Sequence, residues 1–179
     1  MRLFLAVELP EEIRYKLRDT LAELKKTGIS ASLSKYHQLH VTLLFLGEKT
    51  EEEAAKIIEE AKNVKMGKFP IEIGGVGFFP SENYIRVVWV GANDGNGEIK
   101  LLHSKLAKAL DMPPDKEFIS HITLARVKSN DNLKKLKDLQ LTLAEKSFGE
   151  FEADEFCLVK SELTPEGAKY SVVEKFSLG

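Results

Sequence analysis

The sequence predicts a fold that combines helices and strands, in which a β-α-β-α-β unit occurs twice. The pattern His-x-Thr is found at residues 40–42 and again at 121–123, and each copy begins an apolar run typical of a buried strand. The two histidines are 81 residues apart, the difference between positions 121 and 40. When the first half of the chain is shifted by this number of residues, its expected helices and strands fall on those of the second half in the same order. Few side chains are identical between the two halves.

The first half is expected to contain three strands and two helices. Pro10 followed by two glutamates is typical of the first turn of a helix, and Thr50 with Glu53 forms a capping-box pattern. Apolar residues at helical spacing follow both signals. The expected elements are a strand over residues 2–8, a helix from 11 that ends at Gly28, a strand over 40–46, a helix over 51–61 and a strand over 71–79.

The second half is expected to repeat this order and to add one strand. The expected elements are a strand over residues 84–90, a helix over 97–110, a strand over 118–127, a helix capped near Asp131 that carries Leu133, Leu136 and Leu139, a strand around 151–162, and a last strand over 169–178 joined to it by a hairpin turn at 164–167. The repeat units cover about residues 1–80 and 81–179 of a single domain. Such a repeat predicts a pseudo-twofold axis that the two His-x-Thr strands approach from opposite sides.

The two His-x-Thr strands are each expected to be polar on one face and apolar on the other. Alternation along a strand places His40 with Thr42 on one face and Val41, Leu43 and Phe45 on the opposite face. The second copy follows the same rule. A polar face inside a buried strand is costly unless its groups are hydrogen-bonded or line a cleft. A single histidine of this kind is commonly structural, but two equivalent ones favour a shared site.

Two imidazoles and two hydroxyls on one cleft suit a displacement at phosphorus. That reaction needs a base on the attacking oxygen, an acid on the leaving oxygen and donors to the non-bridging oxygens. An unperturbed histidine pKa of about 6.5 lets one ring be neutral and the other protonated near neutral pH. A cyclic phosphodiester carries its own strained leaving group and requires no metal. A zinc site would need a third ligand, and His37 is the only nearby candidate, so we expect no metal.

Composition narrows the class of protein. A net charge of −2 and a pI of about 6.1 argue against a protein that holds long nucleic acids through counterion release, although a single phosphorylated end needs only a few donors. There is no long apolar run, and the only cysteine, Cys157, lies in an apolar context typical of a core. A reducing, cytoplasmic compartment fits this usage. His103 is expected at the surface or its boundary, and the lysines of residues 134–137 on a solvated helix face.

Four segments resemble one family in their sequence and order. They are residues 2–10, 39–47, 120–127 and 161–170, and they are similar to the two-histidine phosphoesterases, in particular to the RNA 2′,3′-cyclic phosphodiesterases, also called 2′-5′ RNA ligases. The resemblance implies a bilobal α+β fold in which antiparallel sheets line a central cleft and helices lie outside. One departure is visible, because many relatives have tryptophan where this chain has Leu33.

The resemblance also implies an activity and a set of site residues. The expected reaction is hydrolysis of a 2′,3′-cyclic phosphate on an RNA end to a 2′-phosphate, without metal or cofactor. His40 would protonate the leaving 3′ oxygen and His121 would activate water, while Thr42 and Thr123 would hold phosphate oxygens. Arg126 would be a further phosphate contact. It is out of phase with His121 in a regular strand, so this role needs a bulge or the end of the strand.

Other functions stay open at this point. The same chemistry would serve a small cyclic nucleotide or an ADP-ribose cyclic phosphate, and a binding module could recognise nucleotides without turnover. Microscopic reversibility permits ligation to a 2′-5′ linkage. We expect a cytoplasmic monomer whose partners are RNA ends or nucleotides that carry a 2′,3′-cyclic phosphate, with no membrane association.

Overall fold

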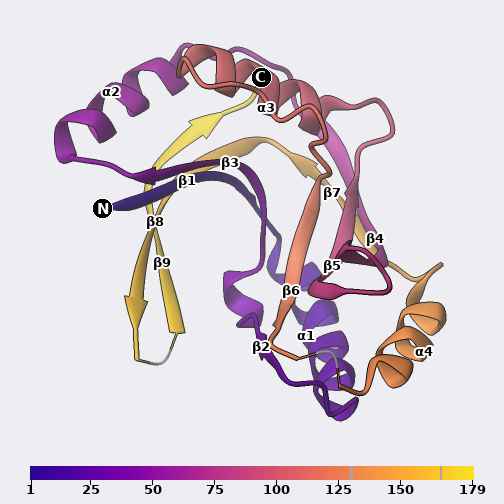
Figure 1. Cartoon of the computed structure of the whole chain (residues 1–179). Coiled ribbons are helices and arrows are strands. Elements are labelled where there is room, and N and C mark those ends of the chain that lie inside the picture. The colour runs from indigo at the N-terminus through magenta and orange to yellow at the C-terminus, as the bar shows by residue number, and fades with distance from the viewer. Residues whose placement is uncertain (130, 166) are drawn as a thin grey trace.

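The protein is described by a computed structural model over residues 1–129, 131–165 and 167–179 (Figure 1). Its helices are α1 (Glu11–Lys26), η1 (Tyr36–Gln38, a 3-10 turn), α2 (Glu51–Lys62), α3 (Glu98–Ala109) and α4 (Leu133–Leu143). Its strands are β1 (Arg2–Glu8), β2 (Ala31–Leu33), β3 (His40–Glu48), β4 (Phe69–Pro80), β5 (Ile85–Asn93), β6 (His121–Val127), β7 (Ser147–Ala153), β8 (Glu155–Thr164) and β9 (Gly167–Ser177). The expected α+β class is confirmed.

The strands form two antiparallel sheets, ordered β3-β1-β8-β9 and β2-β6-β5-β4-β7. The two sequence repeats account for this order, because β1 and β3 of the first unit correspond to β5 and β6 of the second. The strand that closes each unit lies in the other unit's sheet, since β4 pairs with β5 and β8 pairs with β1. The His-x-Thr strands β3 and β6 contact each other where the sheets meet (Figure 1).

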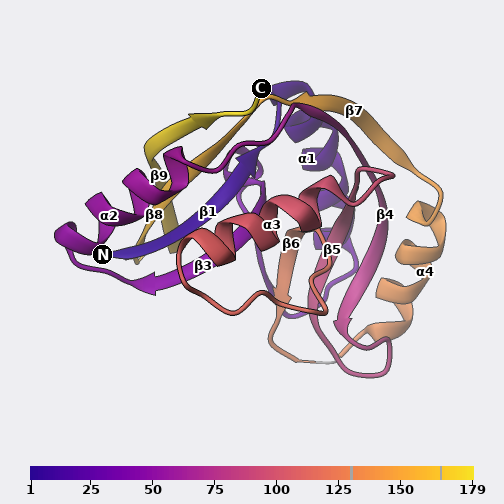
Figure 2. The same ribbon diagram turned by 90° about the horizontal axis from the view of Figure 1, so that it is seen from above.

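The helices lie outside the sheets in two matched pairs. Helix α2 contacts α3, and α1 contacts α4, and the view from above shows α3 crossing beside β3 (Figure 2). Helix α2 begins at a complete capping box, in which Glu53 N–H donates to Thr50 Oγ1 at 3.1 Å and Thr50 N–H donates to the Glu53 carboxylate at 2.8 Å. Helix α4 begins after Asn132, not at the expected cap Asp131, and Asn132 makes no side-chain cap hydrogen bond.

One continuous apolar core joins the two halves. Alternation along β1 sends Leu3, Leu5 and Val7 into it, while Phe4 packs on the opposite face in a smaller cluster with the buried Cys157. The core placement expected for Cys157 is confirmed. Because the large core lies behind both sheets, their other faces are left to line a cleft.

One expected strand was wrong, and one strand was not expected. The strand expected around 151–162 is two strands, because the chain leaves one sheet near Asp154 and enters the other: β7 pairs with β4, and β8 pairs with β1. The short strand β2, which pairs with β6, was not predicted. Within the described ranges, none of the helices is long and apolar enough to cross a membrane.

Candidate active site

The two histidines of the His-x-Thr repeats are held in the same way. His40 begins β3, His121 begins β6, and both side chains are half-buried. Nδ1 of His40 lies 2.7 Å from the main-chain oxygen of Gln38. Nδ1 of His121 lies 2.8 Å from the main-chain oxygen of Ile119. A carbonyl oxygen only accepts hydrogen bonds, so Nδ1 carries the proton in both neutral rings and Nε2 is left for chemistry.

The two threonines lie beside the histidines on the same strand faces. The Thr42 hydroxyl lies 3.1 Å from His40 Nε2 and donates to it when that ring is neutral. Thr123 is half-buried, and its main-chain oxygen accepts from the Ser34 hydroxyl at 2.7 Å. Ser34 also donates its N–H to the Leu124 oxygen at 2.8 Å. Ser34 therefore holds β6 through two hydrogen bonds at its His-x-Thr motif. No pattern in the sequence around Ser34 predicted this role.

A cavity of about 530 Å³ brings together all five site residues expected from the sequence: His40, Thr42, His121, Thr123 and Arg126. Sequence reasoning missed most of the rest of its lining, which includes Arg2, Phe4, Ser34, Phe45, Leu163 and Tyr170. Among the described residues, its lining thus has two arginines and no acid. Such a lining suits an anionic ligand with an apolar portion.

Arg126 faces this cavity because β6 contains a bulge. Thr123 and Ala125 pair with Trp89 and Val88 of β5, so Leu124 has no partner in register. The extra residue shifts the alternation by one position. Arg126 is consequently exposed and in the cleft, and the bulge that its expected role required is confirmed.

The first repeat contains the same bulge, and here the sequence expectation was wrong. Thr42 and Leu44 pair with consecutive residues of β1, so Leu43 is the extra residue. Phe45, expected on the apolar back of the strand, is instead 63% exposed and lines the cavity. The signal was present in the sequence: both motifs are followed by two adjacent apolar residues, Leu43-Leu44 in one and residues 124–125 in the other, which breaks strand alternation.

Burial lowers the pKa of His40. Its ring stacks on Phe4 at a centroid distance of 4.8 Å and meets Tyr170 edge-on at 5.3 Å. This desolvation disfavours the imidazolium and is the largest cause of the low pKa, while the hydrogen bond to the Gln38 oxygen opposes it. Among the nearby charges, Arg14 has the largest effect and lowers the pKa, Glu8 raises it, and His121 lowers it.

Burial also lowers the pKa of His121, in a different electrostatic setting. Phe79 meets its ring edge-on at 4.9 Å, and Trp89 lies 6.1 Å away. Desolvation is again the largest cause of the low pKa, partly offset by the hydrogen bond to Ile119, and Arg126 lowers the pKa further. The pKa of His121 is thus affected by one cation, Arg126, whereas the pKa of His40 is affected by both a cation, Arg14, and an acid, Glu8.

His103, expected at the surface or its boundary, is buried at 2% exposure. Its Nδ1 donates to the main-chain oxygen of Leu43 at 2.7 Å, and its Nε2 accepts from the N–H of Asp115 at 2.9 Å. The ring also stacks on Phe118 at 4.3 Å. Leu43 is the bulge residue of β3, so His103 satisfies the carbonyl that the bulge leaves out of regular pairing, as Ser34 does in β6.

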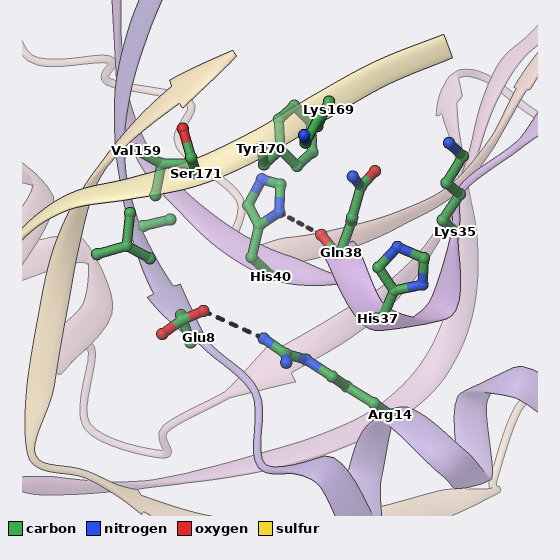
Figure 3. A pocket seen from close by; sticks show the side chains of 12 residues that line it. Glu8, Arg14, Lys35, His37, Gln38, His40, Val159, Lys169, Tyr170 and Ser171 are labelled. Atoms are coloured by element: carbon green, nitrogen blue, oxygen red, sulfur yellow. Dashed lines mark hydrogen bonds and ion pairs between the residues drawn. The ribbon is translucent and has the colours of Figure 1, made fainter. Parts of the chain in front are cut away.

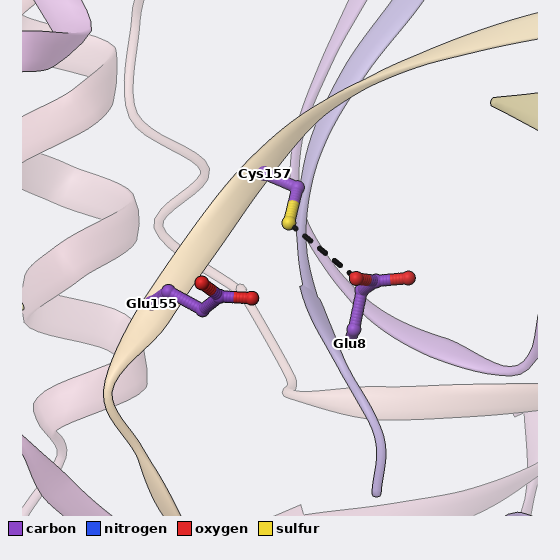
Figure 4. A group of neighbouring side chains, drawn as sticks. All are labelled: Glu8, Glu155 and Cys157. Atoms are coloured by element: carbon purple, nitrogen blue, oxygen red, sulfur yellow. Dashed lines mark hydrogen bonds between the residues drawn. The ribbon is translucent and has the colours of Figure 1, made fainter. Parts of the chain in front are cut away.

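Outside this cavity, Glu8, Glu155 and Cys157 form a group of potential metal ligands (Figure 4). Cys157 Sγ lies 3.8 Å from Glu8, and burial, the largest cause, raises the pKa of the thiol to about 12. Lys175 is an ion-pair partner of both carboxylates. Because the thiol stays protonated and Lys175 and Arg14 already pair with the two acids, this group is explained as a partly exposed ionic cluster beside a buried thiol.

Two His-x-Thr strands that meet at one cleft between two antiparallel sheets define the class of two-histidine phosphoesterases. The sequence profile described as the 2′-5′ RNA ligase superfamily matches residues 9–165, and the chain belongs to this superfamily.

Several known proteins are similar to this chain over almost its whole length. A protein of Methanocaldococcus jannaschii named RNA 2′,3′-cyclic phosphodiesterase is 40% identical over 98% of this chain and 100% of its own length. One of the same name from Archaeoglobus fulgidus is 38% identical over 98% and 99%. The crystal structure of Escherichia coli LigT complexed with 3′-AMP superposes with a TM-score of 0.79, at 25% identity, covering 99% of this chain and 96% of LigT.

Proposed function

We propose that this protein is an enzyme that hydrolyses 2′,3′-cyclic phosphate ends of RNA to 2′-phosphates by general acid and base catalysis at His40 and His121. The observation that carries the proposal is that two imidazoles, each held through Nδ1 by a main-chain oxygen, line one cavity together with Arg126. The curated relatives named for this activity, which match over almost the whole chain, support the choice of substrate.

In the proposed step, one imidazole removes a proton from water as the oxygen bonds to phosphorus. The bond from phosphorus to the 3′ oxygen breaks, and the second imidazole, protonated, gives its proton to that oxygen. The products are a 2′-phosphate and a free 3′-hydroxyl. The hydroxyls of Thr42 and Thr123 donate to non-bridging oxygens, and the Arg126 guanidinium stabilises the negative charge that they carry.

We assign the base to His121 and the acid to His40, as the family resemblance implies. A base must be neutral before the reaction, and Arg126 supports this assignment because it favours the neutral form of His121. The charges beside His40 do not favour its protonated form, because Arg14 lowers its pKa by more than Glu8 raises it, so the acid role of His40 rests on the resemblance alone. The same displacement, with a 5′-hydroxyl in place of water as the nucleophile, would give a 2′-5′ linkage.

The test is hydrolysis of an oligonucleotide with a 2′,3′-cyclic phosphate end, in EDTA. We expect turnover in EDTA and a loss of about 10²-fold or more in His40→Ala and His121→Ala. Circular dichroism of both variants checks that they fold. Undiminished turnover in either folded variant would contradict the proposal.

The same assay separates the alternatives. A protein specific for small cyclic nucleotides or ADP-ribose cyclic phosphates would turn those over in preference to RNA, and a binding module would retain the cyclic phosphate intact. We also propose that the protein is a cytoplasmic monomer. The five expected site residues come from one chain, and a size-exclusion profile at about 20 kDa is the expected result.

A further inference from the structure

A second cavity, of about 390 Å³, adjoins the site on the far side of His40 (Figure 3). His40 and Tyr170 line both cavities, so the two spaces share one wall. The second cavity is built from β1, α1, the turn η1 and its preceding loop, the first residue of β3, β8 and β9. Of its lining residues, only His40 takes part in the proposed hydrolytic step.

This cavity is lined by more positive than negative charge. Arg14, Lys35 and Lys169 contribute cations, and Glu8 contributes the acid. Arg14 Nη2 lies 3.4 Å from Glu8, while its buried Nε has no hydrogen-bond acceptor among the described residues. The exposed Lys35 and Lys169 form no ion pair within the described part of the chain. This excess of cations, on a protein whose net charge is −2, favours binding of an anion in this cavity.

The remaining lining suits the nucleoside portion of a ligand. Val172 is 42% exposed and lies in this cavity with Val159 from the neighbouring strand. Tyr170, at the boundary, presents an aromatic ring to both spaces. Apolar and aromatic surface beside cations is the combination that binds single-stranded nucleic acid, through base contacts and phosphate neutralisation.

The chemistry of an RNA end explains why two anion sites adjoin. The nucleotide that carries the cyclic phosphate is joined through its 5′ oxygen to a phosphodiester, so a second anion lies one ribose away. We infer that the second cavity binds this upstream phosphodiester, with Lys35 and Lys169 as its principal cations. The inference rests on the proposed function and adds to it that the enzyme reads an RNA chain, not only its terminal nucleotide.

The experiment compares three substrates with a 2′,3′-cyclic phosphate end: a mononucleotide, a dinucleotide, and the same dinucleotide with an uncharged methylphosphonate linkage. We expect kcat/KM for the dinucleotide to exceed that for the mononucleotide by about tenfold or more, and the methylphosphonate to lose most of this advantage. In the Lys35→Gln/Lys169→Gln variant the ratio of dinucleotide to mononucleotide kcat/KM should fall about tenfold. Lys134→Gln/Lys135→Gln, which removes two charges from α4, is the matched control and should keep the parent ratio.

Binding of the 2′-phosphate products, measured by calorimetry, tests the inference without turnover. The dinucleotide should bind more tightly than the mononucleotide, with a salt dependence steeper by about 0.7 in the log–log slope, and the cavity variant should lose both differences. Equal ratios in parent and cavity variant, or an equal fall in the α4 control, would overturn the inference. Failure of the hydrolysis proposal would give a different result, because none of the three cyclic substrates would then be consumed, while the comparison of product binding would still test the second cavity.

Discussion

Phe45 and Arg126 occupy equivalent positions, each five residues after the histidine of its repeat and each turned into the cleft by the same bulge. The repeat makes the two imidazole sites alike, but this pair makes the cleft asymmetric, with an apolar side chain on one strand and a cation on the other. This asymmetry supports the proposal that a substrate with an apolar base and an anionic phosphate binds in one orientation, with one histidine as acid and the other as base.

Removal of the Arg126 charge is expected to impair catalysis more than folding. In Arg126→Gln we expect kcat/KM for the cyclic substrate to fall about 10²-fold, because the guanidinium stabilises charge on the phosphoryl oxygens. Arg126→Lys should recover only part of this loss, since it lacks the planar pair of donors. Arg86→Gln is the matched control, because this exposed arginine lies on β5 outside the cavity lining. Equal losses in Arg126→Gln and Arg86→Gln would exclude a local role for Arg126.

The pH dependence of kcat/KM should report the two lowered histidine pKa values of the free enzyme. Burial lowers the pKa of both His40 and His121 below 6.5, so the bell-shaped profile should have its maximum below pH 6.5. A bound phosphodiester favours the imidazolium and opposes this effect. The kcat profile should therefore lie at higher pH than the kcat/KM profile. Coincident profiles centred above pH 7 would contradict this assignment.

The same pKa shifts predict how stability depends on pH. A histidine whose pKa is lower in the folded state binds fewer protons there than in the unfolded chain, so its contribution to stability is complete above the unfolded pKa of about 6.5 and is lost as pH falls through the folded pKa. In His40→Gln, the decrease in unfolding free energy below pH 6.5 should be shallower than in the parent. Urea titrations at several pH values measure both slopes.

Strand alternation predicted the faces of the residues in the two His-x-Thr motifs, but not those of the residues that follow the bulges. His40, Thr42, His121 and Thr123 precede the bulges, where strand alternation still holds, so period-two reasoning placed them on one face. Phe45 comes after a bulge, and its face was assigned wrongly. The split of the expected strand at 151–162 depends on sheet pairing between distant segments, which local patterns do not encode.

The burial of His103 was not predicted, because its partner Leu43 is distant in the sequence. Removal of the His103 side chain is expected to destabilise the fold. His103→Ala leaves the Leu43 carbonyl and the Asp115 N–H without partners, each at a cost of about 1–3 kcal/mol. His103→Asn keeps a donor near the position of Nδ1 and should recover part of this stability. Ser104→Ala, on the exposed side of the same helix, should change the free energy of unfolding little. Urea denaturation measures all three, and parent-like stability of His103→Ala would contradict the role of this side chain.

Gly77 is expected to be necessary for the position of Trp89, whose indole lies beside His121. A Cβ atom at Gly77 would lie 2.2 Å from Cζ2 of Trp89, far inside contact distance, and the same indole lies 6.1 Å from the His121 ring. Gly77→Ala must therefore displace the indole, at a cost typical of overpacking, about 1–3 kcal/mol. Trp89 is the only tryptophan in the chain, so its fluorescence spectrum should shift in the folded variant, together with a fall in turnover.

Gly67→Ala is the matched control for this substitution, because a Cβ atom there meets nothing within 4 Å and the backbone is outside the left-handed region. It should leave the emission spectrum, the unfolding free energy and the turnover close to those of the parent. The comparison isolates contact with Trp89 from the general effect of replacing glycine, which restricts the unfolded chain equally at both positions. An unshifted Trp89 spectrum in folded Gly77→Ala would show that the indole does not rest on Gly77 and would remove the link from this glycine to His121.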